Sequence, residues 1–149
     1  MSFYHAFCGI IASVRSEAHL RFHIMIAVLI SIFAYIYRLD AFGWALLLLT
    51  IGAVISAELF NTAIEKAVDT ATSEIMPSAK LAKDAAAGAV LVLAVCSIFV
   101  GIALFGDIKR IWDTLKYIFT SAKVLISCLI TGTVLLLFVI YGGKNDKQL

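Results

Sequence analysis

The sequence predicts an all-α membrane protein with an N-terminal amphipathic surface helix, three core transmembrane helices and an additional C-terminal transmembrane helix. Of its 149 residues, 62% are apolar and 15% are charged, and the mean hydropathy is +1.02. Soluble domains are nearer half apolar and a quarter charged. A chain of this length cannot bury so much apolar surface in a water-soluble fold, so most of it is expected to contact lipid.

Charge and cysteine content argue against several other classes of protein. The formal net charge is +2, from 12 Lys and Arg against 10 Asp and Glu, whereas nucleic-acid-binding domains are usually strongly basic. No nucleic-acid partner is therefore expected. The three cysteines form no Cys-x-x-Cys spacing, which argues against a zinc site or a redox pair. The N-terminus lacks the basic region of a cleavable signal peptide.

The first element, residues 2–20, is expected to be a helix lying on the membrane surface. Its apolar residues recur at helical spacing, and charged residues follow them, a pattern typical of interfacial helices. The apolar residues are Phe3, Phe7, Ile10, Ile11 and Val14.

Four runs without Lys, Arg, Asp or Glu predict the transmembrane helices. They are residues 22–37, 41–57, 85–106 and 124–143. A spanning helix needs about 17–25 apolar residues. The last two runs meet this length unaided, and the first two reach it when flanking residues are added.

The connections between these runs are more polar. Residues 70–83 form the most polar connection and contain the only proline, and residues 107–123 are expected to form a second interfacial helix. We expect the N-terminus, the 70–83 connection and the C-terminal tail to share one side of the membrane. Lys and Arg are slightly more numerous on that side, which favours the cytoplasm.

The second transmembrane helix is expected to continue beyond its apolar run, and there it carries a polar stripe. Five residues at offsets 0, 3, 4, 7 and 11 fall along one face of a helix with 3.6 residues per turn. They are Glu58, Asn61, Thr62, Glu65 and Asp69. Carboxylates inside or at the edge of a membrane are costly and suggest function. The alternative is an ordinary solvated last turn.

Depth along this stripe separates two kinds of chemistry. Glu58 and Glu65 are seven residues apart, or roughly 10.5 Å along the helix axis. The deeper Glu58 could take a proton from a lipid hydroxyl. The shallower Glu65 could hold a hard cation such as Mg²⁺, and Asn61 could orient either carboxylate.

A second polar cluster begins the third transmembrane helix. Lys83 could meet phosphate oxygens as a point charge, and Asp84 could be a ligand partner or only the cap of the helix. Glu17 could likewise be functional or only an ordinary charged residue, because surface helices usually carry charge on one face. Spacing alone leaves these alternatives open.

Two stretches, AELFNTAIEKAVD (57–69) and AKLAKDAAAGAVL (79–91), resemble the small bacterial membrane lipid kinases of the prokaryotic diacylglycerol kinase and undecaprenol kinase family. The upstream SEAHLRFHI (16–24) is similar to the end of the family's surface helix. The resemblance covers roughly residues 3–106. It divides the chain into a lipid kinase core, residues 1–106, and an interfacial segment, fourth membrane helix and polar tail, residues 107–149.

The resemblance implies phosphorylation of a membrane lipid alcohol, dependent on ATP and Mg²⁺. It implies a homotrimer with shared active sites in the bacterial inner (cytoplasmic) membrane, with the active site facing the cytoplasm. Glu58 is implied as the general base, with Asn61 at the catalytic centre. Glu17 and Glu65 are implied to hold Mg²⁺ with the nucleotide.

Four further residues match positions of the family's site. Glu74, Lys83 and Asp84 are implied to lie around ATP, and Arg21 near the lipid and its phosphate. The chain departs from the family pattern at Cys8, where Lys or Arg is usual, and at Met76, where many members carry His.

The choice of lipid depends on a few positions. Ala87 stands where diacylglycerol kinases tend to carry Ser, and together with Pro77 and the LRFH stretch it favours the undecaprenol kinase branch. Undecaprenol is therefore the expected substrate, and diacylglycerol is the alternative. A small cation-coupled transporter is a rival from another class, because it too would place Glu58 in the membrane beside a polar stripe. A purely structural membrane assembly is a second rival.

Overall fold

Six helices make up the part of the chain that the computed structural model describes, residues 2–72 and 76–143. In chain order they are α1 (Ser2–Ser16), α2 (Ala18–Ile36), α3 (Ala41–Ala71), α4 (Pro77–Phe105), α5 (Ile108–Thr120) and α6 (Ala122–Tyr141). Four of them, α2, α3, α4 and α6, are long and apolar enough to cross a membrane. No strand occurs in the described residues, and the predicted all-α membrane fold is confirmed.

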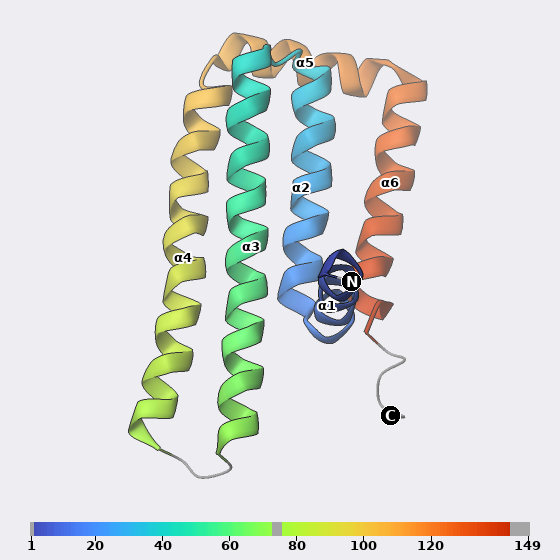
Figure 1. The fold of residues 1–149 in the computed structure, drawn as a ribbon. Helices are drawn as coiled ribbons and strands as arrows, with labels where there is room; N and C mark the ends of the chain where they lie inside the picture. The colour runs from blue at the N-terminus through green and yellow to red at the C-terminus, as the bar shows by residue number, and fades with distance from the viewer. Residues whose placement is uncertain (1, 73–75, 144–149) are drawn as a thin grey trace.

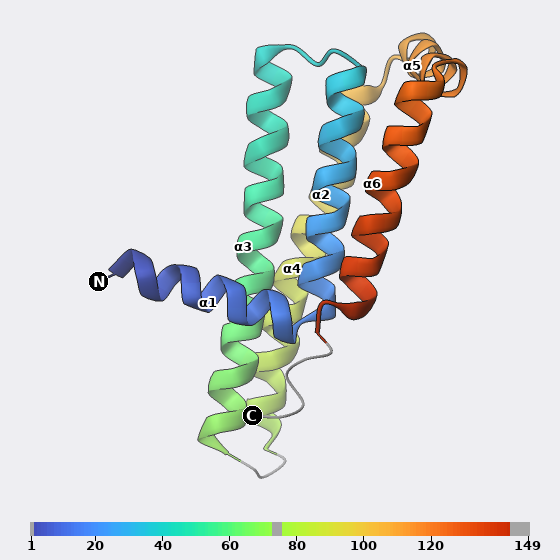
Figure 2. The same cartoon turned by 90° about the vertical axis from the view of Figure 1, so that its right-hand side faces the viewer.

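The four long helices stand side by side, and the two short helices lie across them (Figure 1). α3 packs most extensively on α4, and α2 packs on both α3 and α6. α5 crosses one end of the bundle, and α1 crosses α2 and α3 nearer the other end (Figure 2). The ends of α3 and α4 extend beyond α1. If α1 lies at the membrane surface, these ends reach into water.

Local interactions explain where several helices begin and end. The carboxylate of Asp40 accepts a hydrogen bond from the Gly43 amide at 2.7 Å and caps α3, and Asp107 caps α5 in the same way. At the end of α2, Arg38 adopts a left-handed conformation with φ 58°. The Leu39 amide then donates to the Ala34 carbonyl at 3.0 Å, which closes the helix as a Schellman motif does.

A small aromatic core fastens the end of the bundle opposite α1. Tyr37 and Phe105 are buried there, with ring centroids 5.1 Å apart, and Ala34 and Leu47 complete the cluster. The guanidinium of Arg110 lies 4.3 Å from the centre of the Tyr37 ring, which attaches α5 to this end. Most other large apolar side chains point outward, as expected for a chain surrounded by lipid.

Two predicted boundaries were wrong. The surface helix ends at Ser16, and α2 begins at Ala18, so Glu17 lies at a break between two helices. The expected 70–83 connection is also much shorter, because α4 begins at Pro77. Proline is favoured in the first turn of a helix, where its missing N–H is not needed. Asp84 therefore lies within α4 and does not cap it.

Candidate active site

The polar stripe of α3 is present, and its deepest carboxylate is paired with a histidine of α2. Glu58 is buried, with 5% of its surface exposed. Its Oε1 lies 2.9 Å from His23 Nε2. Thr62, one turn further along α3, is also buried, and its hydroxyl donates to the Glu58 carbonyl at 3.0 Å. The helices α2 and α3 are thus joined at the level of Glu58.

Asn61 and Glu65 form the next pair along the stripe. The Asn61 side-chain amide donates to Glu65 Oε1 at 2.9 Å. The other polar atom of this side chain, Asn61 Oδ1, is buried and has no hydrogen-bond partner within the described residues. A buried acceptor without a partner is unfavourable, so this oxygen is available to a ligand or to water.

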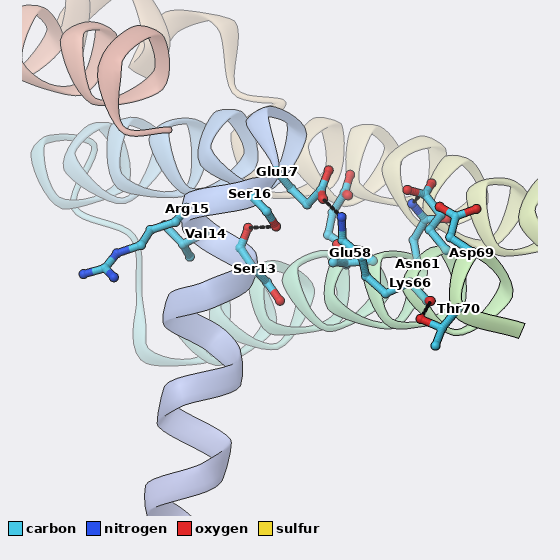
Figure 3. Close-up of polar contacts among 12 residues, drawn as sticks. Ser13, Val14, Arg15, Ser16, Glu17, Glu58, Asn61, Lys66, Asp69 and Thr70 are labelled. Carbon is cyan, nitrogen blue, oxygen red and sulfur yellow. Dashed lines mark hydrogen bonds and ion pairs between the residues drawn. The ribbon is translucent and has the colours of Figure 1, made fainter. Parts of the chain in front are cut away.

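Glu17 approaches the same face of α3 from the break between α1 and α2. It occupies the N-cap position of α2, but its side chain makes no capping hydrogen bond. Its carboxylate instead lies 3.7 Å from the Lys66 ammonium group. Figure 3 shows Glu17, Lys66, Glu58 and Asn61 gathered along this part of α3. The break at Glu17 therefore turns the carboxylate toward the stripe.

Lys83 and Asp69 pair at the water-facing end of the stripe. The Lys83 ammonium group, on α4, donates to Asp69 Oδ1, on α3. Lys83 therefore does not pair with its neighbour Asp84, whose side chain is exposed. Lys83 and Asp84 both lie on α4, and the ammonium group of Lys83 is held by a carboxylate of α3.

Arg21 is buried, and its guanidinium binds backbone carbonyls. Nη1 donates to the carbonyls of Val14 and Arg15 at 2.9 and 2.8 Å, at the end of α1. Nε donates to the Val139 carbonyl at 3.2 Å, in the last turn of α6. Arg21 thus joins the ends of two helices that are far apart in sequence. A contact between Arg21 and the lipid stays a prediction.

An apolar cavity of about 250 Å³ lies between α2, α3 and α4. His23 lines it at one end and Phe105 at the other, with Val54 and Ile55 among the residues between them. The hydroxyls of Thr50 and Ser97 also line it, but both donate to carbonyls of their own helices. The cavity is therefore suited to a hydrocarbon chain, and one of its ends lies beside the residue that holds Glu58.

Comparison with known proteins identifies the family. Residues 4–105 match the model of the family described as prokaryotic diacylglycerol kinase. The chain belongs to this family. It is a lipid kinase, and its four apolar spans make it a multi-pass membrane protein. The match ends at the last residue of α4, so α5 and α6 lie outside it.

Two relatives carry names that agree with this assignment. Undecaprenol kinase of Bacillus subtilis is 44% identical over 104 residues, which cover 70% of this chain and 85% of the relative. Diacylglycerol kinase of Synechocystis sp. is 37% identical over 102 residues, which cover 68% of this chain and 58% of the relative. No solved structure gave a significant match.

The oxygen atoms of the candidate site are of the kind that could share a hard cation with a bound nucleotide. No group of three His, Cys, Asp or Glu residues converges as a metal site within the ranges described. Mg²⁺ commonly binds one or two protein carboxylates and completes its shell with water and substrate phosphates. Glu65, Glu17 and the unpartnered Asn61 oxygen are ligands of this hard type. Their chemistry suits such a shared site, and within the described residues they do not form a closed cage.

The structure brings together most of the predicted site and adds one residue. Glu58, Asn61 and Glu65 follow one face of α3, and Glu17 pairs with Lys66, the residue after Glu65 on the same helix. Glu74 lies outside the described residues. His23 was not predicted as a site residue, since a histidine near a membrane surface is usually only interfacial. One feature of the sequence could have indicated it: apart from the tyrosines, His23 is the one ionisable side chain in the apolar run 22–37.

Proposed function

We propose that this chain transfers the γ-phosphoryl group of ATP to undecaprenol, in a Mg²⁺-dependent reaction that yields undecaprenyl phosphate. The observation that carries the proposal is the buried Glu58 carboxylate, which is held by His23 beside an apolar cavity. If the end of the hydrocarbon chain that carries the hydroxyl lay in this cavity, the hydroxyl would be near Glu58. The 44% identical relative named undecaprenol kinase supports this choice of lipid.

In the proposed reaction Glu58 is the general base. Its Oε1 is bonded to His23, so Oε2 is the atom that accepts the proton of the lipid hydroxyl. The lipid oxygen then forms a bond to the γ-phosphorus, the bond from that phosphorus to the β–γ bridging oxygen breaks, and ADP leaves. Catalysis of this type is mostly positioning and electrostatic stabilisation.

The nucleotide is proposed to bind at the shallower end of the stripe. Glu17 and Glu65 would hold Mg²⁺, which would offset the charge on the phosphates. Lys83 would leave Asp69 and contact phosphate oxygens, and Asp84 and Glu74 would complete the nucleotide site. Lys83 is half-buried and its partner Asp69 is exposed to water, so replacing Asp69 by a phosphate costs little free energy.

The remaining proposals concern assembly and placement. We propose a homotrimer with shared active sites in the bacterial inner membrane, with the α1 end of the bundle on the cytoplasmic side. Residues 1–106 would form the kinase core, and residues 107–149 an appended segment. The water-facing end of α3 supports sharing, because most residues of 63–71 are exposed in the single chain.

A direct assay tests the proposed function. The full chain, purified in detergent, is given radiolabelled ATP and Mg²⁺ with either undecaprenol or diacylglycerol, and the labelled lipid is counted. We expect transfer to undecaprenol to exceed transfer to diacylglycerol, to need Mg²⁺ and to disappear in Glu58→Gln. Preferential labelling of diacylglycerol would favour the activity that the Synechocystis relative's name gives. Labelling of neither lipid would overturn the proposal and favour the transporter.

A further inference from the structure

We infer that His23 is a positioning residue for the catalytic base, and that its Nε2–H group holds Glu58 Oε1 so that Oε2 faces the lipid hydroxyl. The inference rests on the proposed function, in which Glu58 is the base. It assigns His23 a role that acts through Glu58 and does not require contact with the reacting atoms.

The contact is short, shielded and made by two different helices. The distance between His23 Nε2 and Glu58 Oε1 is 2.9 Å, and the exposed fractions of the two side chains are 24% and 7%. Since α2 and α3 are both long transmembrane helices, the bond fixes the Glu58 side chain relative to a rigid frame. A glutamate side chain without such a bond would sample several rotamers.

Other donors near Glu58 are already committed. The Thr62 hydroxyl donates to the backbone carbonyl of Glu58, and the Asn61 amide donates to Glu65. The Lys66 ammonium group pairs with Glu17. Within residues 2–72 and 76–143, His23 is therefore the donor that the structure provides to this carboxylate.

Burial makes this donor important. A buried carboxylate without a hydrogen-bond donor is strongly unfavourable, and a general base must keep a fixed geometry toward the proton that it accepts. One hydrogen bond from His23 meets both needs and leaves the second carboxylate oxygen open. The imidazole also lines the apolar cavity, so its ring borders the path proposed for the lipid chain.

Two substitutions separate the hydrogen bond from the rest of the side chain. His23→Leu introduces an apolar side chain of similar bulk and removes the hydrogen-bond donor. His23→Gln supplies an amide N–H at nearly the same reach. His19→Leu, the same change at an exposed histidine one turn earlier in α2, is the matched control. Each full-length variant is assayed for kcat, for KM of ATP and lipid, and for melting temperature in detergent.

We expect His23→Leu to lower kcat about 10- to 100-fold, a part of the full contribution of a general base, and to leave the KM of ATP within about twofold. His23→Gln should recover most of the lost kcat, and His19→Leu should match the unsubstituted chain. If His23→Leu also melts earlier, recovery of kcat by His23→Gln still identifies the donor as the cause.

Three results obtained with an active unsubstituted chain would overturn the inference alone. Unchanged kcat in His23→Leu would show that Glu58 does not need the bond. Equal loss of kcat in His23→Leu and His23→Gln would show that the donor is not what matters. If kcat stayed unchanged and a higher KM of ATP accounted for the whole loss of kcat/KM, His23 would belong to nucleotide binding. An unsubstituted chain that labels no lipid would overturn the proposed function itself, and the inference with it.

Discussion

Arg21→Met should destabilise the protein by weakening the attachment of α1 and α6 to α2. The side chain makes three hydrogen bonds to carbonyls, two at the end of α1 and one in the last turn of α6. Methionine retains much of the apolar stem but none of the donors. Arg21 itself belongs to α2, so its loss removes a polar link from α2 to the end of α1 and to the end of α6.

The size of the effect follows from the number of bonds. A hydrogen bond to a charged group contributes about 1.5–3 kcal/mol, so three bonds set an upper bound of about 4.5–9 kcal/mol on the loss. Carbonyls at helix ends can bind water after the substitution, and contributions within one cluster do not add. We therefore expect a net loss of about 2–4 kcal/mol, or roughly 5–15 °C in melting temperature.

The measurement is thermal unfolding of the purified full chain in detergent, followed together with lipid phosphorylation at a permissive temperature. Arg15→Met is the control, because the Arg15 side chain is exposed and extends away from the stripe (Figure 3). The reasoning is refuted if Arg21→Met melts no earlier than Arg15→Met. Unchanged melting with a raised KM for the lipid would instead assign Arg21 the lipid contact that the family resemblance implies.

Five further substitutions probe the shallow end of the site and the Arg21 contact. Glu65→Gln should raise the Mg²⁺ concentration for half-maximal activity about tenfold or more, and Asn61→Leu should do so less, since only one ligand oxygen is lost; Mg²⁺ titration of the transfer rate measures both. Lys83→Met should raise the KM of ATP, whereas Asp69→Asn, which frees Lys83, should not; equal effects of the two would contradict a direct phosphate contact. Gly143→Ala should lower the melting temperature, because its Cβ would lie 2.9 Å from the Arg15 carbonyl oxygen; wild-type melting would show that this end of the chain moves aside freely.

Hydropathy predicted the four spans because lipid contact leaves a strong signal in composition. The runs that contain Phe22, Trp44, Leu91 and Leu135 are each long and free of Lys, Arg, Asp and Glu, and each of these four residues lies in a helix that is long and apolar enough to span a membrane. The stripe on α3 was predictable for a related reason, since helical periodicity alone places Glu58 and Glu65 on one face. These features depend on local sequence and need no knowledge of tertiary contacts.

Helix boundaries and pairings depend on contacts between distant residues, and here prediction was weaker. Nothing in the SEAHL stretch breaks a helix by intrinsic propensity, yet the chain turns at Glu17, where Arg21 binds the last carbonyls of α1. The start of α4 did have a local signal, since proline is favoured in the first turn of a helix, but Pro77 was assigned to a connection. His23 could not be paired with Glu58 from spacing, because the register between α2 and α3 is set by packing.

Along α3, the degree of exposure separates the parts of the site that bind from the part that reacts. Two ion pairs lie at the water-facing end, Glu17 with Lys66 and Asp69 with Lys83. Each contains one well exposed side chain, which is Lys66 in the first pair and Asp69 in the second. Such pairs are weak in water, so a nucleotide and its cation can replace them. Glu58 and His23 are shielded, where rearrangement costs much more. We therefore expect substitutions at the exposed pairs to act mainly on KM, and substitutions at the shielded pair to act on kcat.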